Sequence, residues 1–128
     1  MVHIRRHLEQ ALDENRPMAE HGLSEIQHLY KIEHMCDEEN LTPEERKTRR
    51  NELARPIMEA MKLWMETEGV KYSESSQIGK AITYAYTRWD NMMRYLEDGR
   101  LLLDNNLAYH NLNIIPTFFA KSYHKVAA

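Results

Sequence analysis

Apolar residues recur three and four positions apart along most of this chain, which is the period of amphipathic α-helices. In the first third of the sequence this pattern predicts two helices, over about residues 3–15 and about residues 19–38. Pro17 separates them and suits the first turn of the second helix. The positions expected to face the core are Ile4, Leu8, Ala11, Leu12, Leu23, Ile26, Leu29 and Tyr30, followed by Ile32 or Met35.

A third helix is predicted to begin at Thr42, because Thr42 and Glu45 have the spacing of a capping box and Pro43 fits the first helical position. Pro56 falls inside this stretch and predicts either a kink near residues 54–55 or two shorter helices. Gly69 is a natural end for the helix. Its expected inward positions are Leu53, Ile57, Met61, Trp64 and Met65.

A fourth helix is predicted from Ser73 or Ser75, either of which can cap its start, to Asp98, with Gly99 as a left-handed C-cap. Its apolar positions alternate by four and three, a spacing that packs along another helix. These positions are Ile78, Ile82, Ala85, Trp89, Met92 and Leu96.

The last part of the chain has a weaker pattern. An apolar run allows at most one short strand near 101–103, and Asn106 can cap a short helix over 107–112 that ends before Pro116. Phe118 and Phe119 are expected to pack back onto the helices. The predicted fold class is therefore all-α, a helical bundle of four to five helices forming a single domain over residues 1–128.

Composition narrows the location and the classes of partner. The 128 residues carry a net charge of −3, so charge alone does not demand a nucleic-acid partner. The single cysteine, Cys36, excludes an intramolecular disulfide and fits a reducing compartment. No apolar run approaches the roughly 20 residues of a membrane span, and the first residues lack a signal-peptide pattern. We therefore expect a cytoplasmic protein without a membrane partner.

Two groups of polar residues are candidates for chemistry. His3 and His7 are one helical turn apart, a spacing that can hold a metal, but no third ligand is adjacent and a solvated helix start is favoured. The basic run 46–50 can contact phosphates, although the acidic residues around it favour an exposed helix face with local ion pairs. No nucleophile elbow and no glycine-rich phosphate loop occur in the sequence.

Several segments carry a family resemblance. WDNMMRYLEDGRLLLDNN, residues 89–106, resembles the segment W-x-x-x-x-x-[FY]-L-x-D-G-R-L-x-x-D-N-N of transposases of the insertion-sequence family sixty-six, and HIRRHLEQAL, residues 3–12, is similar to that family's [AV]-H-x-R-R-x-[FL]-x-x-A. LYKIE, TPEERKTRRNELARPI and IGKAITYAYTRW stand between them in the family's order. The resemblance covers about residues 1–108 and leaves 109–128 as a divergent tail.

The resemblance implies descent from a DDE transposase, in which three carboxylates on a ribonuclease-H-like core hold two Mg²⁺ ions. Two of these carboxylates would precede residue 1, and the third falls where this chain has Tyr109, a phenol that is neutral at pH 7. The family's following R-P-x-x-x-G-R-K-N segment is also replaced. We therefore predict a truncated, catalytically inactive transposase-derived protein with no catalytic residue, metal ligand or cofactor of its own.

The resemblance also selects residues for DNA contact. Six residues match the family's motif positions and are expected near the former active site: His3, Arg5, Arg6, Arg100, Asn105 and Asn106. The alternative prediction is a helical DNA-binding or dimerisation module that modulates an intact transposase, so DNA, a second copy and an intact transposase are the expected partners. A helical interaction protein unrelated to transposition is the third possibility.

Overall fold

The computed structural model describes residues 1–104, and helices occupy most of this part. Its α-helices are α1 (Val2–Gln10), α2 (Arg16–Glu38), α3 (Pro43–Arg49), α4 (Arg55–Glu68) and α5 (Gln77–Met92). Other helical turns cover Arg50–Ala54, Gly69–Lys71 and Met93–Leu96. Residues 1–104 contain no strand, residues 101–103 included, so the all-α prediction is confirmed. The predictions for 107–112, Pro116, Phe118 and Phe119 lie outside the described residues, and a single domain reaching residue 128 stays a prediction.

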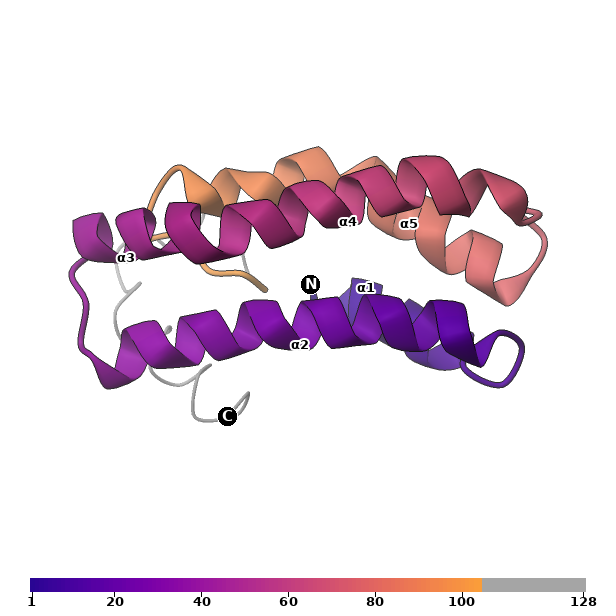
Figure 1. The fold of residues 1–128 in the computed structure, drawn as a ribbon, viewed down its shortest axis with the longest axis horizontal. Coiled ribbons are helices and arrows are strands. Elements are labelled where there is room, and N and C mark those ends of the chain that lie inside the picture. The colour runs from indigo at the N-terminus through magenta and orange to yellow at the C-terminus, as the bar shows by residue number, and fades with distance from the viewer. Residues whose placement is uncertain (105–128) are drawn as a thin grey trace.

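The helices form two layers whose long axes are roughly aligned. Figure 1 shows α2 along one side and a continuous rod of α3, Arg50–Ala54 and α4 along the other, with α1 behind α2 and α5 alongside α4. α1 packs against both α2 and α5, and therefore closes the bundle. Within residues 1–104, no helix is both long and apolar enough to cross a membrane. A cytoplasmic location stays a prediction.

The core lies between the two layers and is centred on Trp89, which is fully buried. The Trp89 indole Nε1 donates a hydrogen bond to the Met58 carbonyl at 2.8 Å, so its polar atom is satisfied in the apolar interior. All six positions predicted to face inward on the fourth helix are buried: Ile78, Ile82, Ala85, Trp89 and Met92 on α5, and Leu96 in the 3₁₀ turn Met93–Leu96. The four-and-three spacing therefore identified the helix face that packs.

Side-chain caps define where most helices begin. The Thr42–Glu45 capping box is confirmed, with the Glu45 N–H donating to Thr42 Oγ1 at 3.2 Å and the Thr42 N–H to Glu45 Oε1 at 2.9 Å. Asn15 caps α2, which begins at Arg16, three residues earlier than predicted. The cap of α5 is Ser76, not Ser73 or Ser75, because the Ser73 carbonyl accepts from both the N–H and the hydroxyl of Ser76 and closes a turn just before the helix.

The proline inside the predicted third helix does divide it. Pro56 stands in the first turn of α4, and the preceding Arg50–Ala54 forms a π-helical turn. A proline has no N–H and clashes with the carbonyl four residues before it, so the turn ahead of it widens. The wider turn brings Ala54 into the core and leaves Leu53 42% exposed, so the prediction that Leu53 faces inward was wrong.

The end of the first helix also differs from prediction. α1 ends at Gln10, not near residue 15, and a turn connects it to α2. Of the two residues of α2 predicted as alternatives for facing the core, Ile32 is buried and Met35 is exposed. Leu12, Leu23, Tyr30, Ile57 and Trp64 are partly buried and pack against the core.

The predicted end of α5 was also wrong. The α-helix stops at Met92, a 3₁₀ turn follows, and no glycine in the described residues has a positive φ, so Gly99 is not a left-handed cap. Gly99 is required for a different reason. A Cβ at this position would lie 1.8 Å from the Pro43 carbonyl oxygen, so only glycine permits the backbone to approach the start of α3 this closely.

Candidate functional site

The centre of the candidate site is an ion pair between α2 and the π-helical turn. Arg50 is 0% exposed and Glu33 is 1% exposed. Arg50 Nε donates to Glu33 Oε2 at 2.9 Å and Arg50 Nη2 donates to Glu33 Oε1 at 2.6 Å. This two-point contact matches the planar guanidinium to the carboxylate, the geometry in which a buried pair is best stabilised.

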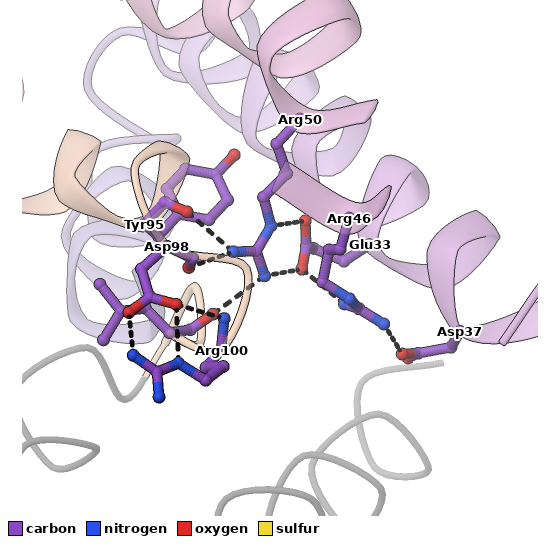
Figure 2. Close-up of polar contacts among 8 residues, drawn as sticks. Glu33, Asp37, Arg46, Arg50, Tyr95, Asp98 and Arg100 are labelled. Carbon is purple, nitrogen blue, oxygen red and sulfur yellow. Dashed lines mark hydrogen bonds and ion pairs between the residues drawn. The ribbon is translucent and has the colours of Figure 1, made fainter. Parts of the chain in front are cut away.

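The rest of the Arg50 guanidinium binds the backbone that follows α5. Arg50 Nη1 donates to the carbonyls of Tyr95 at 2.8 Å and Asp98 at 3.2 Å, and Nη2 donates to that of Leu101 at 2.9 Å. Figure 2 shows the guanidinium between Glu33 on one side and this segment on the other. Tyr95 lies in the last helical turn, Met93–Leu96, and the last carbonyls of a helix have no partner within the helix, so Arg50 supplies a donor near the point where the sequence predicted a glycine cap.

Asn51, the next residue of the π-helical turn, reaches the same segment. Its Nδ2 donates to the Leu96 carbonyl at 2.8 Å and to the Lys47 carbonyl at 2.8 Å. Arg50 and Asn51 together therefore hold four carbonyls of residues 95–101, a segment that we call the D-G-R-L segment. Single π-helical turns are frequent at functional sites, and here the turn presents two adjacent side chains to one target.

A second arginine completes the charge balance around Glu33. Arg46 Nη1 donates to Glu33 Oε1 at 2.9 Å, and Arg46 Nη2 donates to Asp37. Burial alone would lower the pKa of the Arg46 guanidinium, but the Glu33 and Asp37 carboxylates outweigh it and the pKa is raised. Figure 2 shows the resulting chain of contacts from Asp37 through Arg46 and Glu33 to Arg50.

The turn within the D-G-R-L segment has its own ion pair. Asp98 Oδ1 accepts from the Arg100 N–H at 2.9 Å and from Arg100 Nε at 3.1 Å, and Asp98 Oδ2 accepts from Nη2 at 3.0 Å. The hydrogen bonds from Arg100 hold the pKa of the Asp98 carboxyl below its usual range. The aspartate and arginine of this motif therefore engage each other in this structure.

The end of the described chain is attached to α2 by a phenol. The Tyr30 hydroxyl donates a hydrogen bond to Asp104 Oδ1. Burial raises the pKa of Tyr30, and the Asp104 carboxylate raises it further, so the phenol keeps its proton and remains a donor at any physiological pH. The Arg5 guanidinium lies 5.2 Å from the centre of the Tyr30 ring, so α1 also contacts the Tyr30 side chain that binds Asp104.

The six residues predicted to contact DNA are spread over the molecule. His3 and Arg6 are exposed on α1, and Arg5 is partly buried against Tyr30. Arg100 is exposed in the turn after α5, where Asp98 binds it, and Asn105 and Asn106 lie outside the described residues. DNA contact by these residues stays a prediction.

The pair His3 and His7 does not gain a third ligand in the part of the chain that the structure describes. Within residues 1–104, no group of three His, Cys, Asp or Glu residues is placed to hold a metal ion. The His7 ring instead stacks on Tyr84, with ring centres 4.2 Å apart.

Arg50, Asn51 and Glu33 were not singled out from the sequence, and the interpretation of the basic run as an exposed face was wrong for Arg50. A signal was nevertheless present. Arg50 precedes Ala54 by four positions, and Glu33 follows Leu29 by four, so both charges fall on apolar helix faces. Opposite charges at inward positions of two successive helices indicate a buried pair. Arg46 and Arg49 do form ion pairs, but their partners are Glu33 on α2 and Glu39 just after it, not the acidic residues next to the run that were expected.

Comparison with known proteins assigns the chain to a family. The family described as Transposase IS66 family matches residues 1–116. A protein of Sinorhizobium fredii (strain NBRC 101917 / NGR234), described as "Uncharacterized protein y4hP", is 31% identical over 99 residues, which make up 77% of this chain and 18% of the relative. The chain thus spans less than a fifth of that relative's length, and no solved structure matches it. The resemblance in the motifs is confirmed: this chain belongs to the IS66 transposase family.

Proposed function

We propose that this chain is the helical region of a transposase, that it serves DNA transposition by holding the D-G-R-L segment in a fixed conformation, and that it does not cut or join DNA by itself. The observation that carries the proposal is the engagement of the carboxylates around this segment. Glu33 binds Arg50, Asp98 binds Arg100 and Asp104 binds Tyr30.

The chemistry of metal-dependent strand transfer supports the same proposal. Mg²⁺ requires hard oxygen ligands, and a two-metal mechanism requires several carboxylates directed at one point. The sequence places Tyr109 where the family resemblance expects the last of these carboxylates. A phenol with a pKa of about 10 stays protonated at neutral pH and is a poor ligand for Mg²⁺.

A cleavage assay tests the proposal. The purified chain is incubated with supercoiled plasmid DNA and Mg²⁺ or Mn²⁺, with EDTA as the control, and nicked circles are counted on a gel. The proposal expects equal nicking with metal and with EDTA, both for the wild-type chain and for Tyr109→Glu, because one restored carboxylate does not complete a two-metal site. Metal-dependent nicking by the wild-type chain would contradict it.

The second candidate function is a DNA-binding or dimerisation module that modulates an intact transposase. Its dimerisation form is favoured by two apolar side chains that solvent reaches, Leu63 at 60% and Val70 at 79% exposed. Leu63 lies on α4, and Val70 lies in the 3₁₀ turn Gly69–Lys71 that follows it. Sedimentation tests this form: a dimer that Leu63→Glu with Val70→Glu dissociates supports it, and a wild-type monomer at all concentrations excludes it.

A further inference from the structure

The surface where α1 meets α5 gathers cationic and aromatic side chains. The two helices run antiparallel, since Glu14, after α1, accepts hydrogen bonds from the N–H groups of Gln77 and Ile78 at the start of α5, both at 3.1 Å, while His7 stacks on Tyr84 further along. We call this surface the basic strip. Helical spacing around the His7–Tyr84 contact selects its members: His3, with Arg6 and His7 three and four positions after it on α1, and Lys80, Tyr84 and Arg88 at intervals of four on α5.

Arg88 is the cation of the basic strip that makes the most contacts with its neighbours. Its guanidinium carbon lies 3.6 Å from the centre of the Tyr84 ring. Its Nη1 also donates to the Tyr84 carbonyl at 3.1 Å and to Thr87 Oγ1 at 3.0 Å. An exposed guanidinium held against a ring loses little conformational entropy when it binds an anion, and its planar donors match phosphate oxygens.

The charges of the basic strip are not neutralised locally. Within residues 1–104, no carboxylate lies within ion-pair distance of Arg6, Lys80 or Arg88, which are all exposed. Most other arginines and lysines of this part are paired, as Lys62 is with Asp90. Glu9 is two positions from His7 and so lies on another side of α1.

We propose that the basic strip binds the phosphate backbone of duplex DNA, an inference that rests on the transposition function proposed above and names its contact surface. Lys80, Tyr84 and Arg88 follow one another at intervals of four on α5, and the rise from Lys80 to Arg88 is about 12 Å. That distance corresponds to three or four base-pair steps, at about 3.4 Å for each phosphate along a strand. Backbone contacts of this kind position a protein on DNA without reading its sequence.

The basic strip also revises the predicted DNA-binding residues. His3 and Arg6 belong to it, whereas Arg5 lies on Tyr30 and Arg100 binds Asp98. Lys80 and Arg88 are added from a helix that is more than 70 positions further along the chain. A duplex is preferred over other polyanions because the chain belongs to a family of transposases.

The test is an anisotropy titration of a labelled DNA duplex of mixed sequence at several salt concentrations. The triple variant Arg6→Gln, Lys80→Gln, Arg88→Gln is compared with Arg16→Gln, Lys31→Gln, Lys47→Gln, which removes the same charge from exposed positions of α2 and α3. Helix content and melting temperature are measured for both. We expect the first variant to bind at least tenfold more weakly and its salt slope to fall by about 2.7, that is, about 0.9 for each lost phosphate contact, while the second changes less than threefold.

If the two triple variants lost DNA affinity equally, the proposal that the basic strip binds DNA would be overturned. Failure of the wild-type chain to bind the duplex at low salt would overturn it as well. Binding to an RNA duplex or to phosphatidylserine vesicles that is at least as tight as to the DNA duplex would overturn the choice of DNA. These outcomes are separate from the cleavage assay, because metal-dependent nicking contradicts the proposed function whichever surface binds DNA.

Discussion

The basic run 46–50 and the basic strip use the same kinds of side chain in opposite ways. In the run, Arg46 and Arg50 turn toward Glu33, and Arg50 is removed from solvent entirely. In the strip, Arg6 and Arg88 remain exposed, and no carboxylate of residues 1–104 pairs with them. The densest run of positive charge in the sequence thus supplies the buried Arg50, and the proposed DNA surface is assembled from two helices distant in the chain.

The difference teaches that local charge density does not decide exposure. Position on the helix does, because Arg50 falls on the apolar face of its helix and the cations of the strip do not. A buried guanidinium needs its carboxylate and its carbonyl partners in place, so replacing it changes the stability of the fold. An exposed cation reports on what the surface binds. Mutations should therefore separate the two regions by their effect on stability.

The largest effect is expected from Arg50→Ala. The substitution leaves the Glu33 carboxylate buried without its main partner and removes five hydrogen bonds, which should lower the free energy of unfolding by about 3–5 kcal/mol. Arg88→Ala is the matched control, and it should change stability by less than about 0.5 kcal/mol. Urea unfolding followed by circular dichroism measures both. If Arg50→Ala lowered the free energy of unfolding by less than about 1 kcal/mol, the claim that Arg50 stabilises the fold while Arg88 does not would be contradicted.

A smaller effect of the opposite sign is expected from Tyr95→Phe. The Tyr95 ring is fully buried with the Arg50 guanidinium carbon 4.7 Å from its centre, and its hydroxyl has no hydrogen-bond partner within residues 1–104. Removing an unsatisfied buried hydroxyl while keeping the ring should leave stability unchanged or raise it by up to about 1 kcal/mol. Thermal unfolding measures the change, and a clear loss would show that the hydroxyl has a stabilising partner.

The smallest effect is expected from Asp98→Asn, which weakens an ion pair at the surface of the same segment. Because Arg100 lowers the pKa of Asp98 in the folded chain, the pair stabilises the fold above the ordinary aspartate pKa of about 3.9 and loses this contribution as the pH falls through the folded-state value. Asp98 is a third exposed, so screening limits the contribution to a few tenths of a kcal/mol. The wild-type chain and the variant should differ slightly at neutral pH and converge near pH 2. A constant difference at every pH would exclude the ionic explanation.

The sequence predicted well those features that a single helix determines. The apolar face from Ile78 to Leu96, the Thr42 cap and the division at Pro56 all follow from local spacing, and all were confirmed. The sequence did not predict the role of Gly99. This glycine is required by its close approach to the Pro43 carbonyl, which is more than 50 positions away in the chain.

The candidate site was less predictable for the same reason. Arg50 joins α2 to the D-G-R-L segment, 17 positions away on one side and 45 to 51 on the other. Helical spacing places Arg50 on an inward face but does not say which carbonyls it meets, since these depend on how the helices pack. The family motif located the D-G-R-L segment in the sequence, but only the packed structure showed that Arg50 and Asn51 bind its carbonyls.

Calorimetric titration of the chain with Mg²⁺ and Mn²⁺ tests the central proposal most directly. If the carboxylates around the D-G-R-L segment serve the fold and the chain does not catalyse strand transfer by itself, neither ion should bind stoichiometrically, and neither should raise the melting temperature. Tight uptake of one or two ions per chain would contradict this account.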